Sequence, residues 1–151
     1  MASNSYKNYS FMDEQLISPE EVLKIMLKHD RFTEWLGLQI IEIRKGYCKL
    51  QYRITDEMMN GFRSIHGGIL FAAADSAFAF ACNSYGHVTV ALDATISFTK
   101  PAQPGELMQV EASEVFLGNK ISIYDVRTIN EKNELVALFK GTAYRTSKVI
   151  S

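Results

Sequence analysis

The chain is poor in cysteine and proline and has no excess of charge of either sign. Its 151 residues include two cysteines and three prolines, and 16 basic against 17 acidic residues give a net charge of −1. Cys48 and Cys82 offer neither a metal-ligand spacing nor a disulfide framework. The balanced charge argues against general affinity for nucleic acid or for an anionic membrane surface. What remains is an ordinary globular composition, 47% apolar and 22% charged, in a chain long enough to bury a core.

The chain also lacks a hydrophobic run long enough to cross a bilayer. Its most apolar stretch, Ile69–Cys82, is interrupted by Asp75 and Ser76 and is shorter than the about 20 residues that a membrane-spanning helix needs. The N-terminus has no basic segment followed by an apolar one, so no secretory signal is expected. The sequence predicts a cytoplasmic protein with a flexible arm over residues 1–17 and one domain over residues 18–151.

The order of helical and strand patterns predicts an α+β fold. Ser18-Pro19-Glu20-Glu21 is typical of a helix start, and a helical period follows as far as Gly37. A long apolar helix is expected over residues 68–85. Strands are expected over residues 38–44, 47–55, 88–98, 107–117, 121–130 and 135–145. The short connections among the last four strands favour antiparallel pairing, and a helix that is apolar nearly all round must be enclosed by the sheet.

The strand over residues 88–98 alternates between apolar and polar or small residues. The apolar set, which runs at every second position from Val88 through Val90 and Leu92 to Phe98, is expected to face the core. The other face carries threonine and alanine, as a contact surface between two copies would, so a homo-oligomer is expected. Asp93 lies on that face, and we assign it to the surface or to a subunit contact.

One carboxylate in the middle of the apolar helix is the most informative feature. Because an unpaired buried charge is costly, Asp75 is either satisfied by neighbouring polar groups or functional. Gly67 and Gly68 precede it by eight and seven residues, about two helical turns, so the three lie along one side of the helix. The first N–H groups of a helix have no partner within it and suit an anion or a developing oxyanion. A donor pair with a carboxylate predicts a catalytic site.

Three further residues are candidates for the site. His66 is interpreted as orienting the loop or Asn60 rather than as transferring a proton, and Asn60 is either part of a plain turn or part of the site. Lys120 is either a solvated turn charge or a contact for a phosphate group. No His, Cys, Asp or Glu set has metal spacing, so no metal is expected. No Gly-x-Ser-x-Gly signature for a serine nucleophile occurs.

Six segments, taken in order, resemble those of a known family. They are Asn60-Gly61, His66-Gly67-Gly68, Phe71 to Ala74-Asp75, Ala81-Cys82-Asn83-Ser84, Pro101–Glu106 and Gly118-Asn119-Lys120. The chain resembles the hotdog-fold acyl-CoA thioesterases over roughly Leu36 to Arg145, in particular their phenylacetate-degradation branch. The resemblance implies a sheet wrapped round a central helix and subunits paired through their sheets, as a homodimer or a homotetramer made of two dimers. It also implies hydrolysis of a coenzyme A thioester without a metal or redox cofactor.

The resemblance also implies roles for individual residues. Asp75 takes the place of the family's helix carboxylate, which acts as general base or nucleophile. Gly67 takes the place of the residue whose backbone N–H polarises the thioester carbonyl, and Gly68 lies beside it at the substrate. Asn60 matches a residue that positions the attacking water or the carboxylate, and His66 matches the histidine beside the oxyanion glycine. In relatives the carboxylate and the glycine come from opposite subunits, so a monomer should lack a complete site.

The substrate expected from this resemblance is an aromatic, phenylacetyl-like or medium-chain acyl-CoA. Phe62, Phe71, Phe78 and Phe80 lie in or beside the loop and the helix, where an apolar pocket would suit such an acyl group. Two alternatives are a hydratase or dehydratase on the same fold and a non-catalytic acyl-CoA-binding module. The first carries local signatures that this chain lacks, and the joint presence of the carboxylate, the asparagine and the oxyanion glycine argues against the second.

Overall fold

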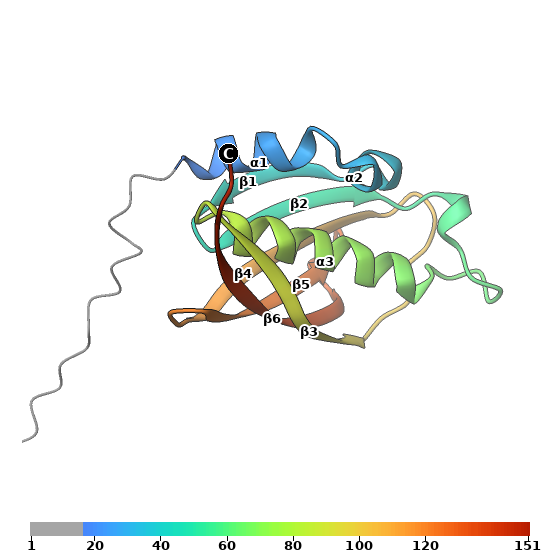
Figure 1. Cartoon of the computed structure of the whole chain (residues 1–151). Helices are drawn as coiled ribbons and strands as arrows, with labels where there is room; N and C mark the ends of the chain where they lie inside the picture. The colour runs from blue at the N-terminus through green and yellow to red at the C-terminus, as the bar shows by residue number, and fades with distance from the viewer. Residues whose placement is uncertain (1–16) are drawn as a thin grey trace, which may run out of the picture.

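A computed structural model describes residues 17–151 of the chain (Figure 1). A six-stranded antiparallel sheet wraps round one central helix, α3, and two short helices cover one end of the sheet (Figure 1). The elements are α1 (Pro19–Leu27), α2 (Arg31–Leu36), β1 (Gln39–Arg44), β2 (Tyr47–Arg53), the 3₁₀ turn η2 (Asp56–Met58), α3 (Gly67–Asn83), β3 (His87–Phe98), β4 (Leu107–Leu117), β5 (Ile121–Ile129) and β6 (Leu135–Val149). The α+β fold, the six strands and the sheet wrapped round a central helix are confirmed.

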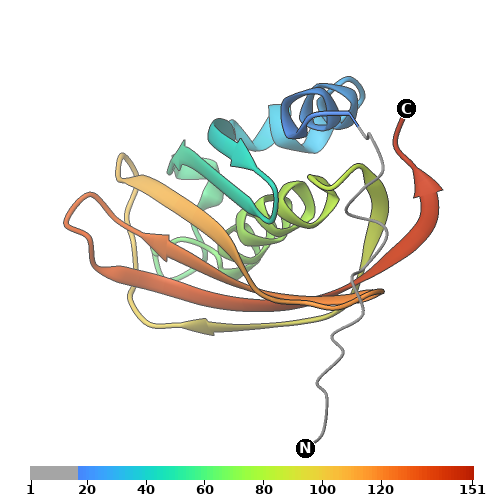
Figure 2. The same ribbon diagram turned by 90° about the vertical axis from the view of Figure 1, so that its left-hand side faces the viewer.

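The strands follow the order β1-β2-β4-β5-β6-β3, so the chain crosses from β2 to the far edge of the sheet through α3 and then β3. Every pairing is antiparallel. The pairs β1–β2, β4–β5 and β5–β6 have the short connections that predict hairpins, but β3 pairs with β6 and not with β4, the strand that follows it in the chain. Figure 2 shows the sheet curving beneath α3, with β1 and β2 on one side of the helix and β3 on the other. The helix is therefore held on one side by the concave face of the sheet.

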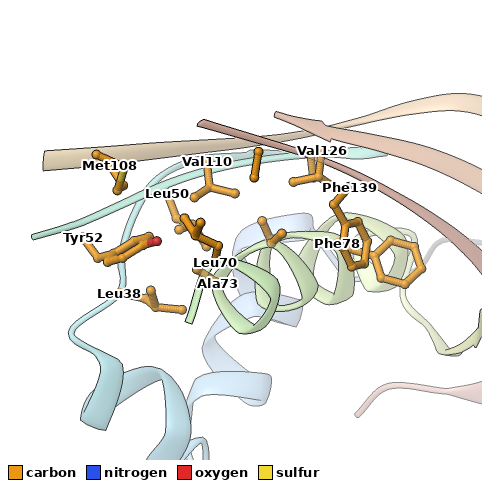
Figure 3. Packing of buried hydrophobic residues seen from close by; sticks show 14 of the residues in the cluster. Leu38, Leu50, Tyr52, Leu70, Ala73, Phe78, Met108, Val110, Val126 and Phe139 are labelled. Atoms are coloured by element: carbon orange, nitrogen blue, oxygen red, sulfur yellow. The ribbon is translucent and has the colours of Figure 1, made fainter. Parts of the chain in front are cut away.

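The core lies between α3 and this concave face (Figure 3). Leu70, Ala73 and Phe78 of α3 pack against strand residues that include Leu50, Tyr52, Met108, Val110, Val126 and Phe139. Small residues let the helix approach closely: a Cβ atom on Gly141 would lie 2.8 Å from the Phe78 ring. None of the helices within residues 17–151 has the length and apolarity that crossing a membrane would require.

The N-terminal helix differs from the sequence prediction, because one continuous helix was expected and two are present. Ser18 and Glu21 form the predicted capping box at the start of α1. α1 ends at Leu27, and Asp30 caps a second helix by accepting the N–H of Thr33 at 2.9 Å. The short carboxylate of Asp30 satisfies a free N–H better at a helix start than inside a helix. The arm expected over residues 1–17 lies outside the described residues, apart from its last position, and stays a prediction.

The edge strand β3 also corrects the sequence analysis. Val90 and Leu92 were expected to face the core, but they are 47% and 56% exposed. A β-bulge between Ala91 and Asp93 interrupts the pairing with β6. Because an extra residue in a bulge shifts the alternation of side chains, the strict two-residue period does not hold along the strand. The result is a long edge strand with exposed apolar side chains.

Candidate active site

The first turn of α3 is shaped by two glycines with different neighbours. His66 is the N-cap of the helix, and Gly67 and Gly68 are its first two residues. A Cβ atom on Gly67 would lie 3.0 Å from the ring of Phe98 at the end of β3. A Cβ atom on Gly68 would lie 2.9 Å from Nδ1 of His66. Each glycine is thus required by a close contact, one with the edge strand and one with the imidazole.

The two glycine N–H groups do not form the expected donor pair. The N–H of Gly68 donates to Nδ1 of His66 at 2.8 Å, so it is already engaged. Within residues 17–151, no acceptor bonds the N–H of Gly67. Of these two N–H groups, only that of Gly67 is therefore available to a ligand acceptor.

A cavity of about 460 Å³ lies beside Gly67. It is lined by Asn60, Ser64, Ile65, Gly67, Leu70, Phe98, Thr99, Lys100 and Pro101. Two of the predicted site residues, Asn60 and Gly67, are brought together here. The cavity combines apolar walls with a few polar groups, as small-molecule sites commonly do.

Asn60 is held in a fixed orientation by the loop that follows it. Its Oδ1 accepts the N–H groups of Phe62 at 2.8 Å and of Ser64 at 3.2 Å, while its own N–H donates to the carbonyl of Ser64. Arg63 takes a left-handed backbone conformation, with φ of 58°, to close this loop. Because Oδ1 is engaged twice, the group that Asn60 can offer to a ligand is the Nδ2 donor.

Asp75 does not reach this cavity. It lies eight residues beyond Gly67 on α3, which is about 12 Å along a rigid helix axis. Its side chain is half-buried, and burial raises the pKa of its carboxyl above the ordinary value. Asp75 belongs to a partly exposed side of α3 that also carries Ala72, Ser76 and Ala79. The helix is therefore not enclosed on all sides, and the carboxylate lies on its open side.

The remaining predicted residues lie elsewhere on the surface. Phe62 is 92% exposed at the tip of the loop that Asn60 closes. Lys120 lies in the turn between β4 and β5, where its Nζ donates to the Tyr144 hydroxyl at 3.3 Å. This turn is at the C-terminal end of α3, opposite the Gly67 cavity (Figure 1). Within one chain, neither Asp75 nor Lys120 can act at the cavity.

The four phenylalanines expected around the acyl group do not line this cavity. Phe78 and Phe80 are buried in the core, and Phe71 packs edge-on against Phe139. The aromatic wall of the cavity is supplied by Phe98 instead.

Sequence reasoning also missed Lys100, which lines the same cavity and forms an ion pair with Glu134 at 2.6 Å. Its position directly before Pro101, where the strand pattern breaks, was the signal that marked a loop at this edge.

A second cavity, of about 720 Å³, lies on the other side of the first turn of α3. Its walls include Trp35, Tyr52, Met58 and Ile69, and none of the predicted site residues borders it. Among residues 17–151, no group of three His, Cys, Asp or Glu side chains is placed to hold a metal ion.

Comparison with known proteins places the chain in a family. Residues 62–137 match the family described as the thioesterase superfamily. A putative esterase from Archaeoglobus fulgidus is 41% identical over 129 residues, which cover 85% of this chain and 84% of the relative. The acyl-coenzyme A thioesterase PaaI of Escherichia coli is 36% identical over 126 residues, covering 83% of this chain and 90% of that protein. The chain belongs to the thioesterase superfamily.

The fold of this thioesterase agrees with that of a solved relative. The structure of the E. coli PaaI protein from the phenylacetic acid degradation operon matches with a TM-score of 0.85 at 34% identity, covering 88% of this chain and 96% of that one. The hotdog fold inferred from the resemblance is confirmed. This thioesterase is a thioester hydrolase. Of the three alternatives, this is the hydrolase and not the hydratase or dehydratase or the non-catalytic binding module. The roles given to Asp75, Gly67, Asn60 and His66 stay predictions.

Proposed function

We propose that this thioesterase hydrolyses acyl-CoA at a site that two copies of the chain build together. The observation that carries the proposal is the separation of Gly67 and Asp75 on α3. An oxyanion donor and the group that attacks or activates water must both lie within about 3 Å of the reacting atoms. Eight residues of helix, about 12 Å, keep the two groups of one chain too far apart. A second copy therefore has to bring its own Asp75 to the Gly67 cavity.

The free edge of the sheet supplies a surface for this pairing. β3 is the last strand in the sheet order and is 12 residues long. Its exposed Val90 and Leu92 make it an apolar edge of the kind that adds another strand. Two β3 strands related by a two-fold axis would run antiparallel and present matched patches to each other. Because Phe98 ends this strand beside Gly67, the same edge borders both the subunit contact and the cavity.

The proposed chemistry uses water and two polar contacts. The thioester carbonyl oxygen accepts the Gly67 N–H, and Asp75 of the second copy takes a proton from water as the water oxygen attacks the carbonyl carbon. The carbon–sulfur bond then breaks, and the CoA thiolate is protonated in turn. Burial raises the pKa of Asp75, which makes its carboxylate a stronger base than an exposed one. The reaction needs neither a metal nor a redox cofactor.

A second route places Asp75 as the nucleophile. Its carboxylate oxygen would attack the thioester carbon, release the thiolate and leave a mixed anhydride that water then hydrolyses. Single-turnover hydrolysis in oxygen-18 water separates the two routes, because only the anhydride route can place label in the Asp75 carboxylate.

Asn60 has a defined part in either route. Its Oδ1 is engaged by the loop backbone, so its Nδ2 donates either to the incoming Asp75 carboxylate or to the attacking water. This contact would keep the attacking oxygen in line with the carbonyl that Gly67 holds.

The substrate is proposed to be an aromatic or medium-chain acyl-CoA, with phenylacetyl-CoA as the leading example. Leu70 and Phe98 give the cavity apolar walls, and a relative at 36% identity is named an acyl-coenzyme A thioesterase. We assign Phe62 to the substrate contact at the rim, and Lys120 of the second copy to a CoA phosphate. We also propose a cytoplasmic location and an assembly of a dimer or of two dimers.

A hybrid dimer tests the shared site. One chain carries Asp75→Asn and the other carries Asn60→Asp together with Gly67→Ala, and two different tags allow the hybrid to be purified. One of its two sites then combines intact residues from both chains, so the hybrid should show about half of wild-type activity although both parents are inactive. A hybrid as inactive as its parents would show that each chain carries its own complete site.

A further inference from the structure

The side chain of His66 forms an unusual helix cap. His66 has an extended backbone, with φ of −66° and ψ of 132°, and its Nδ1 accepts the N–H of Gly68 at 2.8 Å. Helix N-caps are usually Ser, Thr, Asp or Asn, whose side-chain oxygens accept in every ordinary protonation state. An imidazole nitrogen accepts only when it carries no proton. The start of α3 therefore depends on the protonation state of a histidine.

The cap fixes the tautomer of the ring. Because Nδ1 accepts a hydrogen bond, the single proton of the neutral imidazole lies on Nε2. A general base acting through Nε2 would need the opposite tautomer, which has a proton on Nδ1 and loses the bond to Gly68. The ring is thus prepared to hold the helix rather than to take a proton from water.

The backbone of His66 is held on both sides. Its N–H donates to the carbonyl of Met58 at 2.8 Å, and its own carbonyl accepts the N–H of Ile69 at 3.0 Å. These two bonds and the imidazole cap surround Gly67, which lines the cavity. Gly68 leaves room for the ring, since a Cβ atom there would lie 2.9 Å from Nδ1. The His-Gly-Gly segment is therefore one unit that orients a single N–H.

We propose that His66 is a positioning residue whose neutral imidazole holds the Gly67 N–H toward the substrate. This inference rests on the proposed function. Protonation of Nδ1 would place one donor against another at Gly68, and would add a positive charge at the positive end of the α3 dipole. Both effects open the first turn of the helix.

Two variants at one position test the cap. His66→Asn supplies a capping oxygen, and His66→Ala supplies no cap. We expect kcat of the Asn variant at pH 8 to stay within about fivefold of wild type, and kcat of the Ala variant to fall about ten- to a hundredfold with a smaller change in KM.

Nitrogen-15 NMR of the full-length protein without substrate gives an independent readout. Wild-type His66 should carry its proton on Nε2, and the Gly68 amide signal should report a hydrogen bond in wild type and in the Asn variant but not in the Ala variant. A proton on Nδ1, or an Asn variant as inactive as the Ala variant while its Gly68 amide remains capped, would overturn the proposal. The expected NMR result in a protein without thioesterase activity would contradict the proposed function and the catalytic consequence, but would keep the cap.

Discussion

The ring of Phe98 lies 3.0 Å from the position that a Cβ atom would take on Gly67. Phe98 ends the edge strand β3, and Gly67 begins the central helix α3. The contact therefore joins the free edge of the sheet to the first residue of the helix, which lines the cavity. A contact this short leaves room for a methyl group only if the Phe98 ring or the first turn of the helix shifts by a few tenths of an ångström.

Gly67→Ala should test this contact directly. The added methyl group would displace either the Phe98 ring or the first turn of α3, so kcat should fall about ten- to a hundredfold with less change in KM. Adding Phe98→Leu should recover part of the loss, because a smaller side chain frees the space. Gly61→Ala is a matched control, since nothing lies within 4 Å of a Cβ atom there. Steady-state kinetics of the three variants would contradict the idea if the double variant were no better than Gly67→Ala.

Asp75→Asn should reduce turnover and raise stability in the same molecule. The variant removes the proposed base or nucleophile, so kcat should fall by about a hundredfold or more. Burial raises the pKa of Asp75, so the folded chain holds this proton more tightly than the unfolded chain. Stability then decreases as pH rises from about 4, the ordinary pKa of Asp, through the raised folded value.

The neutral amide that Asp75→Asn introduces avoids this loss of stability. The melting temperature of the variant should therefore exceed that of wild type at pH 7 and approach it below about pH 4, as followed by circular dichroism across the pH range. A variant that melts below wild type at pH 7 would mean that interactions with its surroundings stabilise the ionised Asp75 carboxylate more than burial destabilises it.

Leu92→Glu should prevent assembly. Leu92 is 56% exposed at the bulge of β3, and a charge placed there would have to be buried when two edges pair. Light scattering should give a monomer near 17 kDa, and activity should be lost with the second copy. Leu138→Glu on the neighbouring strand β6 is a suitable control, because Leu138 is 41% exposed but does not lie on the free edge. An active monomer of the Leu92 variant would refute the shared site.

The acyl specificity should favour apolar groups larger than acetyl. Each methylene buried against Leu70 and Phe98 contributes about 0.8 kcal/mol, so kcat/KM should rise from acetyl- to hexanoyl-, benzoyl- and phenylacetyl-CoA. Phe98→Ala removes the aromatic wall, so it should reduce the difference in kcat/KM between acetyl-CoA and the larger substrates. If acetyl-CoA proved the best of the four substrates, the assignment of the cavity and the aromatic preference would both be wrong.

The sequence predicted most of the elements because their patterns are local. The strand over residues 107–117 has the predicted bounds, and α3 differs by one residue at its start and two at its end. The break at Asp30 and the bulge after Ala91 were missed, because each follows from hydrogen bonds that hydrophobic periodicity does not encode.

For the candidate site, the spacing of Gly67 and Asp75 along one helix implied a separation of about 12 Å. The resemblance implied that the two groups at one site come from different subunits. The engagement of Gly68 by His66 was not predictable, because it depends on the direction of one imidazole ring.

The position of Gly67 and Asp75 on a single helix restricts how the activity can be regulated. An α-helix fixes the distance between its turns. No loop closure, hinge motion or side-chain rearrangement within one chain can therefore shorten that distance. A lid that opens and closes could admit substrate, but it could not complete the pair. Control over this hydrolase would then act on the association of chains, through concentration or through a competitor for the β3 edge, and catalysis would be switched on when two chains meet.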